Sequence, residues 1–270
     1  MALHIPLPKQ ILTHAHWTLG KRKMAKSTGN VVNPFFAMDR FGVDAIRFYM
    51  AYDGGIQDDA DYENHFITER YRKCLHGGIG GLASRVIRSK AWDIREAIGS
   101  RTPENLGQTS LHGQDAQVTE LHRDFLTRLP SIASKHFEDL DSGAAVRVIT
   151  DLVFDTNAYL QNIGPWDKTR LTKPERMEIL FLCAESLRIC GILLQPYMPG
   201  KMSELLDTLG VSPGRRKFAD TAIGADLDYG TPPPEIKARL GKGIEGSLFP
   251  PLTIEWPDKI KGLPSQLRNI

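Results

Sequence analysis

The residues best suited to chemistry lie in one short stretch, GKRKMAKSTGN, at residues 20–30. Its cationic side chains are Lys21, Arg22, Lys23 and Lys26. Such a cluster can follow the charges of a phosphate chain, and glycines at both ends let the loop hinge. In nucleotidyl transfer, negative charge grows on the departing pyrophosphate, so cations that engage it best in the transition state raise the rate. A bare K-x-x-K string, however, favours an ordinary solvated basic hairpin.

The segments on either side of this loop are predicted to hold it in place. Before it, ILTHAHWTL at residues 11–19 alternates in polarity and contains β-branched and aromatic residues, which predicts a strand. After it, Asn33-Pro34 predicts a helix start, Gly42 an interruption, and residues 44–52 a second helical segment. The sequence therefore predicts a strand, a phosphate-sized loop and a helix in that order.

The remaining chain predicts a helical bundle. Helical periodicity covers residues 64–90, a segment from about residue 115, a segment from Asp141 or Ser142 to Ile163, and a segment from about Pro174 to Leu194. The second of these is expected to bend at Pro130 and to bury one face, listed as Val118, Leu121, Phe125 and Leu129. Residues 95–114 and 211–250 are expected to be connectors, and residues 248–256 a small strand or turn packed back on the body.

The composition is typical of a globular protein. The chain has 270 residues, 41% hydrophobic and 24% charged, which suits one large or two smaller globular domains. The net charge of +2 gives no global case for a polyanion partner, so local clusters must make any such contact. Three cysteines fit neither a disulfide framework nor a zinc site; a reduced compartment is expected, with Cys183 and Cys190 in a core and no metal site.

No membrane span is expected. The most apolar segment, residues 179–194, contains Glu185 and Arg188 near its centre, which predicts a buried helix. The first residues, MALHIPLPKQIL, lack the features of a secretory signal or a transit peptide.

Residues 8–52 closely resemble the end of the catalytic domain of methionyl-tRNA synthetases, which are class I enzymes. Their KMSKS signature appears here as Lys23-Met24-Ala25-Lys26-Ser27, between H-x-H-W-T and S-x-G-N-V-V-x-P, with F-G-x-D-A-x-R-F further on. The resemblance implies that Lys26 contacts the phosphates of ATP, which is bound with Mg²⁺, and that Lys23 and Ser27 support it. Lys23 and Lys26 are thus the implied catalytic residues, and Ala25 replaces the usual serine. Trp17 and His14 or His16 would flank the nucleotide side, although core packing and ordinary hydrogen bonds explain them equally.

The helical half also resembles this family, in which a bundle recognises the methionine anticodon. GLASR, residues 81–85, is similar to the family's N-L-A-S-R segment, and NIGPW, residues 162–166, to the segment whose tryptophan stacks on an anticodon base. The resemblance implies that Arg85 and Trp166 bind the anticodon of tRNA-Met by hydrogen bonds and stacking. Without it, Trp166 would be a hydrophobic helix cap and Arg85 a solvated side chain. Gly81 replaces the asparagine of bacterial relatives, and the Gly-Gly-Leu pattern is more like mitochondrial members.

The implied fold is mainly α: residues 1–60 end a class I Rossmann-type catalytic domain, and residues 61–270 form an anticodon-binding domain with a C-terminal extension. The implied activity is methionine–tRNA ligation through methionyl-adenylate. No H-x-G-H string occurs, so the chain is expected to be the C-terminal half, from a truncated gene model or a split product, and inactive alone. Expected partners are tRNA-Met, methionine and ATP, with no membrane, for a monomer in the mitochondrial matrix or else the cytoplasm.

Three other functions stay open on the sequence. A non-catalytic tRNA-binding helical module, left after loss of the catalytic half, would keep RNA affinity without catalysis. The leucine, valine, isoleucine and cysteine enzymes share the loop, although H-x-H-W-T and NIGPW favour methionine. A purely structural bundle leaves the cationic loop without a role.

Overall fold

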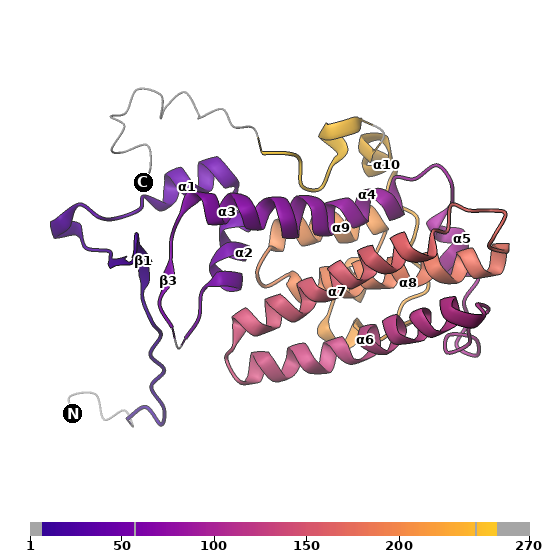
Figure 1. Ribbon diagram of the computed structural model, residues 1–270, viewed down its shortest axis with the longest axis horizontal. Coiled ribbons are helices and arrows are strands. Elements are labelled where there is room, and N and C mark those ends of the chain that lie inside the picture. Colours follow the sequence, from indigo (N-terminus) through magenta and orange to yellow (C-terminus); the bar gives the residue numbers. More distant parts are fainter. Residues whose placement is uncertain (1–6, 57, 241, 253–270) are drawn as a thin grey trace.

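The computed structural model describes residues 7–56, 58–240 and 242–252, and is mostly helical (Figure 1). The strands are β1 (Trp17–Leu19), β2 (Arg22–Lys23) and β3 (Ala60–Asp61). The helices before the bundle are α1 (Pro34–Phe41) and α2 (Val43–Asp53). The bundle contains α3 (Asn64–Arg70), a π-helix (Tyr71–Gly80), α4 (Gly81–Ile87), α5 (Ile94–Gly99), α6 (Gly113–Glu138), α7 (Ser142–Ile163), α8 (Lys173–Leu194), α9 (Pro199–Leu209) and α10 (Pro234–Leu240).

The strands form one small sheet of order β2-β1-β3, in which β1 pairs antiparallel with β2 and parallel with β3. The predicted strand over residues 11–19 is confirmed only for residues 17–19. Residues 7–14 are exposed, and Figure 1 shows this stretch leading away from the helical body. The alternating pattern predicted the strand correctly at residues 17–19, where β2 and β3 supply hydrogen bonds. It extended the strand too far toward the N-terminus, because residues 11–14 have no neighbouring strand to pair with in the described part of the chain.

The helix pair after the loop is as predicted. The Asn33 side chain accepts a hydrogen bond from the Phe35 backbone N–H at 3.0 Å and caps α1, and Pro34 occupies the first turn. Gly42, with φ 83°, separates α1 from α2. Phe48 and Tyr49 of α2 belong to the same buried apolar cluster as the helices of the bundle, so one core extends across both parts of the chain.

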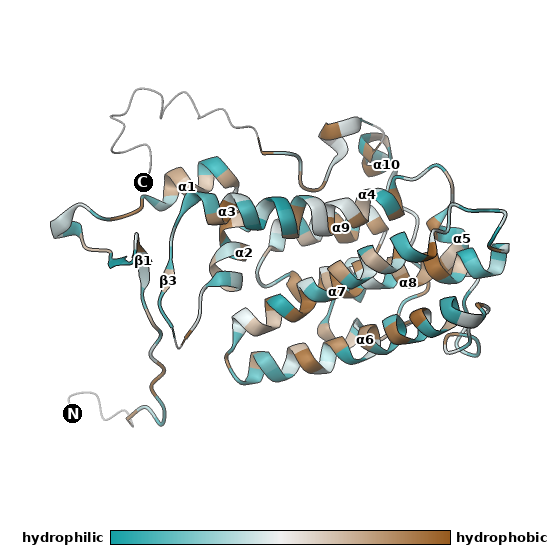
Figure 2. Ribbon diagram, viewed as in Figure 1, coloured by the Kyte–Doolittle hydropathy of each residue, from teal (hydrophilic) through white to brown (hydrophobic). Residues whose placement is uncertain are grey.

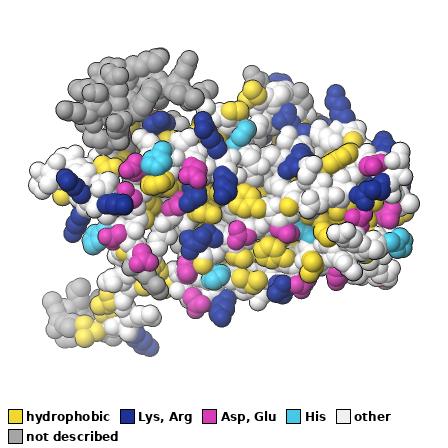
Figure 3. Space-filling model, in the orientation of Figure 1, with side chains coloured by type: hydrophobic (Ala, Val, Ile, Leu, Met, Phe, Trp, Pro, Cys, Tyr) yellow, Lys and Arg dark blue, Asp and Glu magenta, His cyan; other side chains and the backbone are white. Residues whose placement is uncertain are grey.

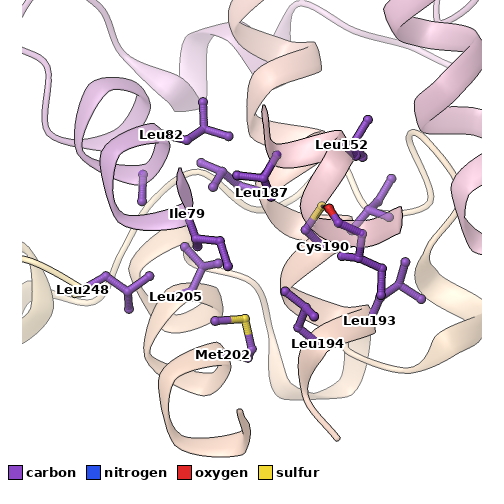
Figure 4. Close-up of a cluster of buried hydrophobic side chains, with 14 of the residues drawn as sticks. Ile79, Leu82, Leu152, Leu187, Cys190, Leu193, Leu194, Met202, Leu205 and Leu248 are labelled. Carbon is purple, nitrogen blue, oxygen red and sulfur yellow. Dashed lines mark hydrogen bonds between the residues drawn. The ribbon is translucent and has the colours of Figure 1, made fainter. Parts of the chain in front are cut away.

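Helix α8 occupies the centre of the bundle. It contacts α5, α6, α7 and α9, and every residue from Met177 to Leu194 is buried. Figure 4 shows its side chains Leu187, Cys190, Leu193 and Leu194 among residues from the π-helix, α4, α7 and α9. In Figure 2, hydrophobic and hydrophilic stretches alternate along α6 and α7, as expected for helices with one face on this core.

The buried face of α6 differs from the predicted one. Leu121, expected inside, is 72% exposed. The residues that α6 buries are Thr119, His122, Arg123, Leu126, Leu129 and Ala133. The predicted list assumed that only apolar side chains face inward, whereas three of the six buried residues of α6 are polar.

Polar partners on neighbouring helices explain the orientation of α6. The His122 ring lies 2.5 Å from Asp155 through Nδ1 and stacks on Tyr159 at a centroid distance of 4.4 Å. Arg123 Nη2 donates to Glu178 Oε1 of α8 at 2.6 Å. Because buried polar groups require hydrogen-bond partners, these pairs determine which face of α6 turns inward.

The predicted helix over residues 64–90 is confirmed as a continuous helix from Asn64 to Ile87. Its middle part is a π-helix, and its two ends are the α-helices α3 and α4. At Gly78, a Cβ atom would lie 3.4 Å from Phe154 Cε1 of α7. The π-helix and α7 therefore pack against each other at this position.

Glu185 and Arg188, which argued against a membrane span, form a fully buried ion pair on α8. Arg188 Nε and Nη2 donate to the two carboxylate oxygens of Glu185 at 2.6 and 2.8 Å. In the described part of the chain, no helix is long and apolar enough to cross a membrane.

The same pair holds the segment that follows α9. Arg188 donates to the backbone oxygens of Asp220 and Ala222, and Tyr229 Oη donates to Glu185 Oε1 at 2.7 Å. A segment with little regular structure is thus fixed to the centre of the bundle by charge-assisted hydrogen bonds.

Some elements were missed by the sequence prediction. Helices α5 and α10 lie in segments that were predicted to be connectors, and α9 was not predicted. Pro199 opens α9 at a position where its missing N–H costs nothing. At the C-terminal end, Leu248 and Phe249 are buried against the body as predicted, and residues 253–256 of that prediction lie outside the described residues.

All three cysteines are unpaired and buried, which confirms the core location of Cys183 and Cys190. Burial raises the pKa of the Cys74 thiol to about 11. The thiols therefore contribute to packing.

We expect Glu185→Ala to lower the free energy of unfolding by about 3–5 kcal/mol, because it leaves the Arg188 guanidinium buried without its counter-ion. Urea unfolding of the 270-residue chain measures this loss. The matched control is Asp124→Ala, which removes an exposed helical partner of Arg128 and should cost less than about 1 kcal/mol. Equal losses in the two variants would contradict an anchoring role for the buried pair.

Candidate functional site

The cationic loop begins with a tight hairpin. Leu19 of β1 pairs with Arg22 of β2, which leaves Gly20 and Lys21 as the two turn residues. Both have positive φ, 59° and 60°, as a type I′ turn requires. This turn matches the twist of the strands and places Lys21, Arg22 and Lys23 in succession along the hairpin.

Asp61 of β3 secures the base of the hairpin. Its Oδ1 accepts from Thr18 Oγ1 at 2.7 Å and from the Lys21 backbone N–H at 3.0 Å. One carboxylate thus joins the strand before the turn, the turn and the neighbouring strand.

The far part of the loop closes on itself. Ala25 and Asn30 form an antiparallel bridge, and a 3₁₀ turn over Lys26–Thr28 lies between them. Gly29 ends that turn with φ 67°, in the left-handed region. Lys26 and Ser27, the predicted phosphate contacts, are therefore side by side at the tip, and both are exposed.

The loop keeps its positive charge free. Its cationic side chains, at positions 21, 22, 23 and 26, are all exposed, and no residue in the described part of the chain forms an ion pair with them. In Figure 3, Lys and Arg side chains gather at the end of the molecule where β1 lies. Exposed, uncompensated cations on one loop can bind a phosphate chain.

The residues just before the loop make packing contacts and hydrogen bonds within the chain. Trp17 is half-buried and packs against Tyr49 of α2 at a centroid distance of 5.6 Å. The His16 backbone N–H donates to Asp59 at 2.8 Å, and His14 contacts the oxygen of its neighbour Ala15. These contacts favour core packing and ordinary hydrogen bonding for Trp17 and the histidines.

Arg85 and Trp166 both line one cleft of about 600 Å³, although 80 residues separate them in the chain. One wall comes from Ser84 to Trp92, at and after the end of α4. The others come from Leu160 of α7 and from the C-terminal residues Leu240 and Gly243. Figure 1 shows β1 and the end of α4 far apart along the long axis, so the cleft and the loop are separate sites.

Trp166 presents part of its ring to solvent. Gly164 ends α7 with φ 64°, and a Cβ on it would lie 3.3 Å from Trp166 Cζ2, so the indole lies directly against the glycine backbone. The side chain remains 47% exposed. The covered part of the ring caps the end of α7, and the exposed part offers a surface on which a planar base can stack.

Arg85 is not a freely solvated side chain. It is half-buried, and its Nη2 donates to Asn157 Oδ1 of α7. Its neighbour Arg88 donates to the backbone oxygens of Leu240 at 2.9 Å and Gly243 at 2.7 Å, which fixes the C-terminal wall of the cleft. The cleft therefore combines a held guanidinium with an exposed aromatic ring, as the reading of an unpaired base requires.

Sequence reasoning missed Arg88 and Asn157. Arg88 acts on carbonyl groups about 150 residues away, which no local pattern reveals. The spacing of Asn157 could have identified it. It follows Val153 by four residues and precedes Leu160 by three, so it lies on the predicted buried face of its helix.

No metal site is evident in residues 7–56, 58–240 and 242–252, where no group of three or more His, Cys, Asp or Glu side chains could hold an ion.

We expect Asp61→Ala to loosen the hairpin, because it removes the acceptor for both Thr18 and the Lys21 N–H. Limited trypsin digestion should cut within residues 21–26 about five times faster, as the loss of about 1 kcal/mol of hydrogen bonding implies. Asp58→Ala, at an exposed position three residues earlier, is the control and should leave the rate unchanged. Equal rates in the two variants would contradict the role given to Asp61.

Comparison with known proteins adds independent information. Residues 1–87 match the family described as tRNA synthetases class I (M). The chain is 43% identical over 268 residues to a probable mitochondrial methionine–tRNA ligase of Neurospora crassa, covering 97% of this chain and 41% of the relative. It is 36% identical over 221 residues to the probable mitochondrial enzyme of Schizosaccharomyces pombe, covering 81% of this chain and 39% of the relative.

A solved structure of a methionyl-tRNA synthetase has a similar fold. Mycobacterium tuberculosis methionyl-tRNA synthetase in complex with methionyl-adenylate superposes with a TM-score of 0.65 at 26% identity, covering 85% of this chain and 43% of that protein. The chain thus spans less than half the length of these relatives. Because sequence and fold agree along most of its length, the chain belongs to the methionyl-tRNA synthetase family and resembles its mitochondrial members.

Proposed function

We propose that this chain is the C-terminal part of a methionine–tRNA ligase, with an ATP-phosphate loop at residues 20–30 and an anticodon-binding cleft far from it along the long axis of the molecule. The observation that carries the proposal is the cleft that brings Arg85 together with the exposed ring of Trp166. A tRNA must reach a catalytic site with one end and be identified at the other, and two separated sites suit that task.

In this proposal the loop acts on the first step of the reaction. The methionine carboxylate attacks the α-phosphorus of ATP, methionyl-adenylate forms and pyrophosphate leaves. Lys26 and Lys23 would stabilise the charge that grows on the pyrophosphate, and Ser27 would donate a hydrogen bond to a phosphate oxygen. The loop contains no carboxylate, so Mg²⁺ would enter with the ATP phosphates, which supply its ligands. The methionyl-adenylate complex of the Mycobacterium tuberculosis relative supports this chemistry.

The cleft would act on tRNA-Met. One anticodon base would stack on the exposed face of Trp166 while the Arg85 guanidinium donates hydrogen bonds to a base edge. This assignment makes residues 61–270 the anticodon-binding part and residues 1–60 the end of a Rossmann-type catalytic domain. The two parts are joined by contacts such as Arg147 Nη1 to the Tyr52 oxygen at 2.7 Å.

The names of the Neurospora crassa and Schizosaccharomyces pombe relatives support a mitochondrial location. The monomeric state and the cytoplasmic alternative stay predictions from the sequence.

The second candidate is a tRNA-binding module without catalysis. It is favoured by one observation: both residues predicted to bind RNA line a cleft within the described chain, whereas the loop supplies only phosphate-binding groups and no reacting group. The two candidates differ in whether the chain supports adenylate formation.

We expect Trp166→Ala to weaken binding of a stem-loop RNA with the methionine anticodon CAU by about tenfold or more, because stacking contributes about 1–3 kcal/mol per base. Fluorescence anisotropy with the 270-residue chain measures this affinity. Phe218→Ala removes an aromatic ring of similar exposure, 48% against 47%, and is the matched control. An unchanged affinity in Trp166→Ala would remove the tryptophan from the proposed RNA site.

We expect Lys26→Ala to lower methionine-dependent ATP–pyrophosphate exchange by about 10²–10³-fold, as for loss of one donor to transition-state charge. The assay uses a chimera in which this chain replaces the matching part of the Neurospora crassa ligase. Lys135→Ala, at an exposed position on α6, is the control. A chimera that binds the stem-loop but has no exchange activity before mutation would favour the non-catalytic module.

A further inference from the structure

Asn157, a residue of α7 outside the lining of the cleft, holds the side chain proposed to read a base. Its Oδ1 accepts from Arg85 Nη2. No other hydrogen bond or ion pair of Arg85 occurs in the described chain, so this contact alone fixes the plane of the guanidinium.

The orientation of the Asn157 amide is fixed by the backbone. Its Nδ2 donates to the Val153 oxygen at 2.9 Å and to the Gly78 oxygen at 3.2 Å. A flipped amide would place its oxygen against two carbonyl oxygens and its NH₂ group against the Arg85 cation. The oxygen therefore faces Arg85.

The π-helix brings one of these two carbonyl groups into reach. Gly78 lies within it, at a point where the π-helix packs against Phe154 and Val153 of α7. Irregular π-helical turns are often found at functional sites. Asn157 thus connects α7, the π-helix and α4 at a single side chain.

We infer that Asn157 is the positioning residue for base discrimination in the cleft, acting through Arg85 without touching the RNA. A guanidinium is planar and carries its N–H groups in a fixed fork, so fixing one nitrogen fixes the directions in which the others donate. A guanidinium held in one plane can donate to one arrangement of acceptors on a base edge. A guanidinium that rotates freely can donate to several arrangements and therefore discriminates less between bases. This inference rests on the proposed anticodon function of the cleft.

The test compares discrimination between stem-loops. The affinity of the 270-residue chain for the CAU stem-loop is divided by its affinity for loops with one anticodon base changed. Asn157→Leu, which has a similar volume and no acceptor, should lower this ratio about tenfold, in line with the strength of hydrogen bonds to charged groups. In an Arg85→Ala background it should have no further effect, because the interaction through which it acts is gone.

Controls separate positioning from general stability. The matched control is Gln117→Ala, which removes an exposed amide on α6 and should leave the discrimination ratio unchanged. Thermal melting identifies variants that do not fold, and Asn157→Ala replaces Asn157→Leu in the cycle if the leucine variant melts without a cooperative transition.

The outcomes distinguish the inference from the proposed function. If the unmutated chain discriminates between loops and Asn157→Leu discriminates equally well, the inference fails and the anticodon function stands. An equal loss with and without Arg85 would also overturn it, because Asn157 would then act through the fold alone. If the unmutated chain does not discriminate at all, the anticodon function fails and the inference with it.

Discussion

The constraint on which the bundle depends is the burial of α8 from Met177 to Leu194. A helical stretch with no exposed face must satisfy its charged groups inside the protein, since an unpaired buried charge is costly. Glu185 and Arg188 meet this need by pairing with each other and by binding the segment after α9. Glu178 meets it through Arg123 of α6. The central helix therefore determines both how α6 is turned and where the C-terminal part of the chain runs.

Charged side chains are paired at the centre of the molecule and, among the described residues, unpaired on the hairpin. On α8, each buried carboxylate has a cationic partner, whereas the lysines of the hairpin have none within the described chain. A buried charge left without a partner is costly, whereas an unpaired exposed charge is available to an external anion. The cleft around Trp166 lies between these extremes, because Arg85 is held by a neutral amide that leaves its charge uncompensated.

Local patterns predicted much of this structure. The helix starts at Asn33 and Asp141, the helix end at Gly164 and the burial of α8 follow from capping residues and periodicity. The partners of buried polar residues could not be predicted, because the contact from His122 to Asp155 and the contact from Arg85 to Asn157 join distant positions. The same limit placed Leu121 on the wrong face. At the candidate sites, motifs selected the residues, and only the fold brought Arg85 and Trp166 to one cleft.

The π-helix also has a consequence for the phase of the helical run that contains it. A hydrogen bond from residue i to i+5 requires more residues per turn than the 3.6 of an α-helix, so α4 is rotated about the common axis relative to an uninterrupted continuation of α3. The face of α4 that carries Arg85 is therefore set by the length of the glycine-containing π-helical stretch. A one-residue deletion there would turn the guanidinium away from Trp166 while leaving the sequence of both motifs intact.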